Sequence, residues 1–328
     1  MSECHGSRVQ WKIYGAESYH EAVSLLLAAG GRTLSVFLSE EVDVPRASGP
    51  TIARWQLGAQ LKGLREAAKI TQLQIAEVLG CSESKIYKIE SGDVGINRGD
   101  LLVMLDRYKV GEDDPRRETA FDLQRQGKQR GWWAKYGNLP SNYAMYVGLE
   151  GAATEVKDFE LAVVPGLLQT EGYARAIGSA NWPDQPEEVE RRVELRMARQ
   201  ACLTEDPLLK FWGIVDEAVL HRRTGGDEVI HGQLRHLIDM GKQPNVTIQV
   251  LPFGEGWHPG TAGSFSILEF PEAVHSPVAY IESQAGDVYL EREDDMRRVT
   301  LRFTHLQTAA LSQAKSRELM AAIARELA

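Results

Sequence analysis

The chain has 328 residues, of which 43% are hydrophobic and 25% are charged, and its formal net charge is −9. This length suggests about two domains, and the composition is that of a globular protein rather than a disordered or fibrous one. No apolar run approaches the ~20 residues that a membrane-spanning helix needs. The first ten residues lack the basic and then apolar pattern of a signal peptide. We therefore expect a cytoplasmic protein with no membrane partner.

The three cysteines, Cys4, Cys81 and Cys202, lie far apart and form no CxxC pair. This spacing argues against a disulfide framework and against a structural zinc site. We expect no metal and no cofactor.

Residues 9–44 are predicted to form a small β-α-β unit. Residues 9–14 and 32–38 have the β-branched and aromatic content of short strands. Between them, Ser18 and Glu21 form a capping box that opens an apolar helix. A unit of this size cannot bury a core alone. We assign residues 1–50 to this unit and its linker.

Residues 71–92 read as two short helices that meet at a glycine. Thr71 is a candidate N-cap, and Gln74 three residues later completes a capping box. Ile75, Ala76, Val78 and Leu79 are predicted to form the apolar face of this helix. Gly80 can adopt the left-handed backbone that ends a helix abruptly. The pattern indicates a tight turn between the two helices.

The second of these helices is predicted to begin after Ser82, which is a candidate N-cap. Ile86 and Ile89 are spaced to bury one face, while short polar and basic side chains occupy the rest, and Gly92 ends the helix. Two helices joined by a tight glycine turn, the second with polar and basic groups exposed, match a DNA-binding helix-turn-helix. The alternative is an ordinary helical hairpin with no nucleic-acid partner.

The flanking segments agree with the first interpretation. Residues 57–70 are predicted to form a helix with Leu57, Leu61 and Leu64 on one face. Residues 96–110 are predicted to form another helix, capped by Asn97 and packed through Leu101, Leu102 and Leu105. The whole stretch resembles the helix-turn-helix of the phage-repressor-like (XRE) family. We assign residues 51–114 to this all-α, lambda-repressor-like domain.

Charge is distributed unevenly between this module and the rest of the chain. Residues 54–109 carry nine Lys and Arg and seven Asp and Glu, a balance of +2. Because the whole chain has a net charge of −9, the remaining residues carry a net charge of −11. Phosphate contacts supply most non-specific affinity for DNA. We therefore expect weak non-specific binding, a specific operator site and a homodimer that doubles the contacts.

The resemblance implies which residues meet DNA. Gln72, at the start of the first helix of the pair, is the candidate phosphate clamp. Along the second helix, the candidates for the base edges are Glu83, Ser84 and Lys88. Lys85 is expected to meet a phosphate, Tyr87 either a base or a phosphate, and Ser82 is a further DNA-binding candidate. Arg98 is a further phosphate candidate. The alternatives are a carboxylate at Glu83 that only favours the helix dipole, and solvated surface charges at Lys88 and Arg98.

Residues 115–328 are predicted to form a larger α+β domain. A joining helix runs from about 116 to 129. Further helices are expected near 142–153, 170–178, 186–203, 226–240, 293–308 and 312–327, and strands near 155–162, 208–215, 246–252, 264–270, 278–283 and 287–291.

Five sequence segments in this part resemble the large C-terminal domain that follows such a helix-turn-helix in many actinobacterial regulators. They are VVPGLLQTEGYARA (163–176), DEAVLHRRTGG (216–226), VTIQVLPF (246–253), HPGTAGSFSILEF (258–270) and VAYIESQAGDVYLEREDDMRRVTLRF (278–303). That domain has no settled biochemical activity. The resemblance also implies an antitoxin-like role with a small protein partner encoded nearby.

Aromatic residues of the second domain are candidates for a site that binds a small-molecule effector or a protein partner. They are Trp132, Trp133, Trp212, Trp257, His258 and Tyr280. The alternative is that they pack helices onto the sheet. For Trp257 and His258, which lie on a Gly/Pro loop, the alternative is a rigid turn between strands.

Nothing in the sequence indicates catalysis. There is no GxSxG elbow, no HExxH, no Walker loop and no GxGxxG that opens a helix. Glu269, Glu282 and Glu291 lie on or near predicted strands, where carboxylates are usually solvated. We expect a transcriptional regulator, with two alternatives: an antitoxin-type protein whose main partner is a small protein, and a small-molecule sensor addressed to DNA.

Overall fold

The computed structural model describes residues 49–137, 139–271, 276–283 and 286–327. The predicted β-α-β unit at residues 9–44 lies outside these ranges. No helix in the described ranges is long and apolar enough to cross a membrane.

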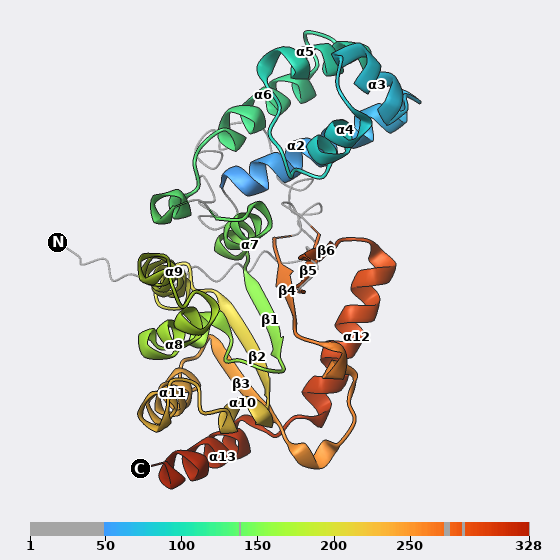
Figure 1. The fold of residues 1–328 in the computed structure, drawn as a ribbon. Coiled ribbons are helices and arrows are strands. Elements are labelled where there is room, and N and C mark those ends of the chain that lie inside the picture. The colour runs from blue at the N-terminus through green and yellow to red at the C-terminus, as the bar shows by residue number, and fades with distance from the viewer. Residues whose placement is uncertain (1–48, 138, 272–275, 284–285, 328) are drawn as a thin grey trace, which may run out of the picture. The chain divides into compact units, whose positions relative to one another are not determined.

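The first described part is all helical, as predicted. Its helices are α2 (Pro50–Ala67), α3 (Gln72–Leu79), α4 (Glu83–Glu90), α5 (Arg98–Arg107) and α6 (Pro115–Gly127). Figure 1 shows these helices in blue to green. Their apolar faces meet in one core, which includes Leu57, Leu61, Leu64, Ile75, Ile86, Ile89, Leu101, Met104 and Leu105. The predicted caps Thr71, Ser82 and Asn97 each accept a hydrogen bond from a backbone N–H of the first turn.

Helix α2 begins seven residues before the predicted start at residue 57. Pro50 occupies its first turn, where a missing N–H costs nothing and the fixed φ suits a helix. The helix ends at Ala67 rather than at residue 70. Lys69 adopts a left-handed backbone with φ of 57°, and the N–H of Ile70 donates back to the carbonyl of Arg65. The unit and linker assigned to residues 1–50 therefore overlap the start of α2 at Pro50.

Two residues predicted to be in the core are on the surface instead. Val78 of α3 and Leu102 of α5 are 45% and 41% exposed. Each lies next to a residue of the apolar face, and the 100° step of a helix turns it away from the core. Met104, which the sequence analysis did not single out, takes the core position in α5 and is fully buried.

The second part contains a mixed sheet of six strands among the described residues. The strands are β1 (Glu155–Glu160), β2 (Lys210–Asp216), β3 (Val246–Leu251), β4 (Phe265–Glu269), β5 (Val278–Ile281) and β6 (Val288–Leu290). Their order is β3-β2-β1-β4-β5-β6. The first three are parallel to one another, whereas β4 pairs antiparallel with β1, and β5 and β6 continue antiparallel. All six predicted strands are confirmed.

Helices cover both faces of the sheet. Figure 1 shows α12 (Glu293–Ala309) on one face and α8 (Glu171–Asn181), α9 (Pro186–Arg199) and α11 (Asp227–Met240) on the other. Helix α7 (Ser141–Ala152) precedes β1, and α13 (Gln313–Glu326) contacts α11 and β3. These helices confirm the prediction of an α+β domain. The short helix α10 (Glu217–His221) and the 3-10 helix η1 (Trp132–Tyr136) were not predicted.

Helix α2 contributes to both cores. Leu57, Leu61 and Leu64 pack in the helical core, while Ile52 and Trp55 pack in the main core of the second part, with Tyr146, Leu149 and the sheet. The helical module is therefore joined to the second part through a shared helix.

Candidate nucleic-acid interface and the cavity of the second part

The turn between α3 and α4 has the geometry of a helix-turn-helix. The N–H of Gln74 donates to Oγ1 of Thr71 over 3.2 Å, and the N–H of Thr71 donates to Oε1 of Gln74 over 2.9 Å, which completes the predicted capping box. Gly80 has φ of 63°, a left-handed backbone conformation that residues other than glycine rarely adopt. The N–H of Lys85 donates to Oγ of Ser82 over 3.3 Å, which starts α4 immediately after the turn.

Helix α4 is held against α2 by very close backbone packing. A Cβ atom at Gly58 would lie 2.5 Å from the carbonyl oxygen of Glu90. At the end of α4, Gly92 has φ of 75°, and a Cβ atom there would lie 2.1 Å from Cδ1 of Trp55. Only glycine fits at these two contacts without a shift of the backbone. The position of α4 is therefore set by α2.

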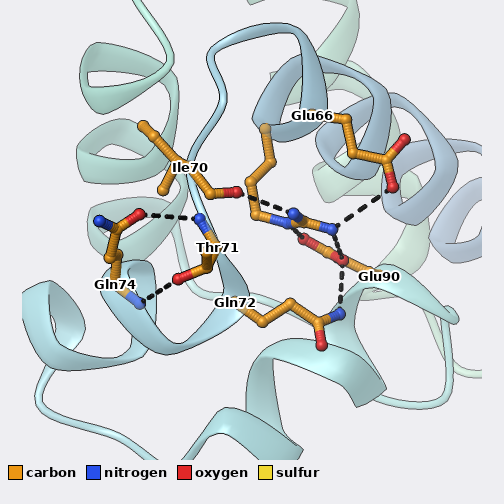
Figure 2. Close-up of polar contacts among 7 residues, drawn as sticks. Glu66, Ile70, Thr71, Gln72, Gln74 and Glu90 are labelled. Atoms are coloured by element: carbon orange, nitrogen blue, oxygen red, sulfur yellow. Dashed lines mark hydrogen bonds and ion pairs between the residues drawn. The ribbon is translucent and has the colours of Figure 1, made fainter.

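A buried ion pair also fixes α4. Nε and Nη2 of Arg65 donate to the two carboxylate oxygens of Glu90 over 2.6 Å and 3.0 Å, and Nη1 of Arg65 donates to the carbonyl of Ile70. Hydrogen bonding to Glu90 raises the pKa of Arg65. Figure 2 shows Glu66 and Gln72 on either side of this pair, with Gln72 directed to the Glu90 carboxylate. Two charged groups thus connect α2 to the end of α4.

This network determines where the Gln72 side chain lies. Its amide Nε2 donates to Oε2 of Glu90 over 2.8 Å. In this structure the amide that was predicted to clamp a phosphate therefore binds a carboxylate inside the module, and its phosphate contact stays a prediction. The sequence analysis missed Arg65 and Glu90. Their spacing could have identified them, because each lies four residues after a buried apolar residue, Leu61 and Ile86.

The remaining candidates lie on an open face of α4. Ser82, Glu83, Ser84, Lys85 and Lys88 are exposed, and Tyr87 is 60% exposed. In addition, Nζ of Lys85 lies 3.6 Å from a carboxylate oxygen of Asp100. The structure therefore brings together polar donors and acceptors on one side of a helix whose other side is buried.

Arg98 lies at the start of α5, outside this face. It is exposed, and its guanidinium carbon is 4.4 Å from the centre of the Phe121 ring.

The six candidate residues of the second part do not form one site. Trp132 and Trp133 contact each other edge to face at 6.1 Å, and Trp212 packs on Phe303 of α12 and donates to Gln249. Trp257 is 82% exposed, whereas the adjacent His258 is buried with Nε2 3.4 Å from a carboxylate oxygen of Asp216. Among the six, Tyr280 alone lines the cavity described next.

This cavity has a volume of about 550 Å³ and lies between the sheet and helices α7, α8 and α9. The strand register places Asp158 opposite Ser266, and Ser266 opposite Tyr280, so the three side chains form a row across one face of the sheet. Oγ of Ser266 donates to Oδ1 of Asp158 over 2.8 Å. Glu160 lies two residues further along β1 and lines the cavity beside Asp158.

Burial perturbs both carboxyl groups. Burial raises the pKa of Asp158 to about 7, in part opposed by the Ser266 hydrogen bond. Burial and the neighbouring Asp158 raise the pKa of Glu160 well above its usual range. The charged groups that interact with Asp158 include Glu150, Glu160 and Arg199. The sequence analysis missed Asp158 and Glu160. The available signal was that Asp158 breaks the alternation of the strand, because it takes a buried position directly after the charged Lys157.

The raised pKa of Asp158 predicts a pH-dependent stability. The folded protein retains a proton that the unfolded chain, with an ordinary pKa of about 4, releases. The free energy of unfolding should therefore fall as the pH rises through the interval from about 4 to 7. The Asp158→Asn variant should not lose stability in this way. In urea unfolding, its free energy of unfolding relative to that of the unmodified protein should therefore be higher at pH 8 than at pH 5. An equal difference at both pH values would mean that Asp158 titrates normally.

Comparison with known families matches two segments of the chain. A model described as "Helix-turn-helix domain" matches residues 56–118, and one described as "Domain of unknown function (DUF5753)" matches residues 143–322. The first covers α3, α4 and α5, and the second covers the sheet and the cavity. No curated protein and no solved structure gives a significant match to the chain.

Proposed function

The chain belongs to the family defined by the domain of unknown function (DUF5753) and carries a helix-turn-helix, and from this premise we propose that it is a sequence-specific transcriptional regulator. It binds operator DNA with α4 in the major groove, and its second part senses a ligand or a protein partner. In this proposal the chain has a regulatory rather than a catalytic role.

The observation that carries this proposal is the two-sided character of α4. Ile86, Ile89 and Glu90 anchor one side, whereas Glu83, Ser84 and Lys88 are exposed on the other. A rigidly held helix with exposed donors and acceptors can read base edges, and its anchoring keeps the side chains in register. The net charge of −9 limits non-specific attraction to DNA, so specific contacts must supply the affinity.

We further propose that the protein binds its operator as a homodimer in the cytoplasm. A single module with a small positive balance makes few phosphate contacts, and two copies on adjacent half-sites double them. An antitoxin-like function, with a small protein partner encoded nearby, remains the alternative role of the second part.

Lys88→Ala tests the proposed role of α4. We expect operator affinity to fall by about 1–3 kcal/mol, or about 5- to 150-fold, because an amine that donates to guanine O6 and N7 is lost. Affinity for a scrambled duplex should change little. Fluorescence anisotropy titration of both duplexes at two salt concentrations measures these effects.

Lys128→Ala is the matched control, since Lys128 is an exposed lysine that follows α6 rather than lying on α4. It should leave both affinities nearly unchanged. Equal losses on both duplexes for Lys88→Ala would assign Lys88 to a phosphate. Equal weak binding of the unmodified protein to both duplexes would contradict specific regulation.

Small-molecule sensing is favoured for the second part by a continuous path of aromatic contacts. Tyr146 and Tyr280 line the cavity, with ring centres 4.5 Å apart. Tyr280 contacts Tyr289 at 5.2 Å, and Tyr289 meets Trp55 of α2 edge to face at 6.4 Å. Trp55 in turn packs against Gly92 at the end of α4. This path supports coupling between a ligand in the cavity and the DNA-binding helix.

A further inference from the structure

The charges around the cavity differ in how they are paired. Arg199 donates to both carboxylate oxygens of Glu150 over 2.8 Å and 2.6 Å. Arg192 donates to Glu188 over 2.7 Å and stacks on Trp182, with its guanidinium carbon 4.3 Å from the ring centre. The third lining arginine, Arg196, donates to Oε1 of Gln169 over 2.7 Å. Two of the three arginines are thus paired with carboxylates, whereas Arg196 is bound by a neutral amide oxygen and its buried Nε has no described hydrogen-bond partner.

The carboxylates of the cavity are paired less directly, because Arg199 favours the ionised form of Asp158 and Arg196 that of Glu160 without a direct contact. Four line it: Asp158 and Glu160 on β1, Glu282 after β5 and Asp287 before β6. Within the described ranges, none of the four forms an ion pair with a basic side chain, and Asp158 is held by the Ser266 hydroxyl. Burial makes the ionised form of Asp158 costly and raises its pKa, and a cation that entered the cavity would favour the ionised form and offset this cost.

Tyrosine rings form the adjacent wall. Tyr143 and Tyr146 of α7 are stacked with their planes 10° apart, and Tyr146 contacts Tyr280 of β5. The faces of such rings attract organic cations as well as apolar groups. Carboxylates beside aromatic faces therefore select for a charged amine on a small carbon skeleton. No group of three or more His, Cys, Asp or Glu side chains in the described part is placed to hold a metal ion.

We propose that this cavity binds a small organic cation, a protonated amine whose ammonium group lies against Asp158 and Glu160 and whose carbon skeleton lies against Tyr146 and Tyr280. This inference rests on the proposed sensing role of the second part. The ligand's N–H groups would donate to the carboxylate oxygens, and a volume of about 550 Å³ suits a molecule of metabolite size.

Matched pairs of amines and alcohols test the chemistry. Cadaverine and tyramine are compared with 1,5-pentanediol and tyrosol, which replace each amine by a hydroxyl, at 10 mM, pH 8 and constant ionic strength. We expect at least one amine to raise the melting temperature of the full-length protein by about 3 °C or more. The matching alcohol should raise it by less than about 1 °C. If neither amine exceeds its alcohol, the proposal is overturned.

Variants separate the cavity from general attraction to an acidic protein. Asp158→Asn and, independently, Glu160→Gln should abolish the difference between amine and alcohol. Glu155→Gln, the same charge change on β1 outside the cavity lining, should preserve it. An amine effect that survives both cavity variants would place the amine elsewhere and refute the site.

Operator anisotropy in the same samples distinguishes this inference from the proposed function. Amine binding by a protein that shows no operator preference would retain the cavity site and refute the regulator. Operator preference without amine binding would retain the regulator and refute the cation site.

Discussion

Arg65→Met is expected to lower the free energy of unfolding of the helix-turn-helix by about 3–5 kcal/mol. The side chain of Glu90 is 2% exposed, and Arg65 provides two of the hydrogen bonds that its carboxylate accepts. Without Arg65, a buried charge retains only the neutral Gln72 amide as a described hydrogen-bond donor. Because the pair joins α2 to the end of α4, operator binding should weaken together with stability.

Urea unfolding followed by circular dichroism measures the loss, and hydrogen exchange shows whether α3 and α4 open first. Arg107→Met is the control, since Arg107 is an exposed arginine in the last turn of α5. It should change stability by less than about 0.5 kcal/mol. The double variant Arg65→Met with Glu90→Met should recover part of the loss, because it leaves no unpaired charge. A single variant as stable as the control would contradict a structural role for this pair.

Arg199→Met is expected to cost a similar ~3–5 kcal/mol in the second part. Arg199 and Glu150 are 4% and 2% exposed, and Nη1 of Arg199 also donates to the hydroxyl of Tyr143 over 2.8 Å. The substitution leaves Glu150 charged and buried beside the cavity. It also removes the guanidinium that lies near the rings of Tyr143 and Tyr146.

Arg191→Met on the same helix provides the comparison. Arg191 pairs with Glu188 at the surface, with half of its side chain exposed, so its loss should cost no more than about 1 kcal/mol. Thermal and urea unfolding of both variants measure the difference. Combining Arg199→Met with Glu150→Gln should restore part of the stability, and similar costs for Arg199→Met and Arg191→Met would show that the buried pair is not critical.

The local sequence was sufficient to predict the helix-turn-helix. Its turn depends on contacts within about four residues, which are those of the capping box at Thr71, the left-handed Gly80 and the Ser82 cap. Such contacts can be predicted from the sequence pattern alone. The helices and strands of the second part were predictable for the same reason, since periodicity of 3.6 or 2 reports which face is buried. The misassigned Val78 and Leu102 lie at the edge of apolar faces, where that periodicity is least decisive.

The tertiary structure decided which distant residues meet. The position of Gln72 depends on a carboxylate 18 residues away, and the row of Asp158 and Ser266 joins positions separated by 108 residues. No local pattern encodes the strand order β3-β2-β1-β4-β5-β6, which creates that row, or the division of α2 between two cores. The sequence by itself thus determined most of the elements and the helix-turn-helix, because these follow from short-range hydrogen bonds and burial. The cavity and its unpaired carboxylates arise only when strands far apart in the chain pair in one register.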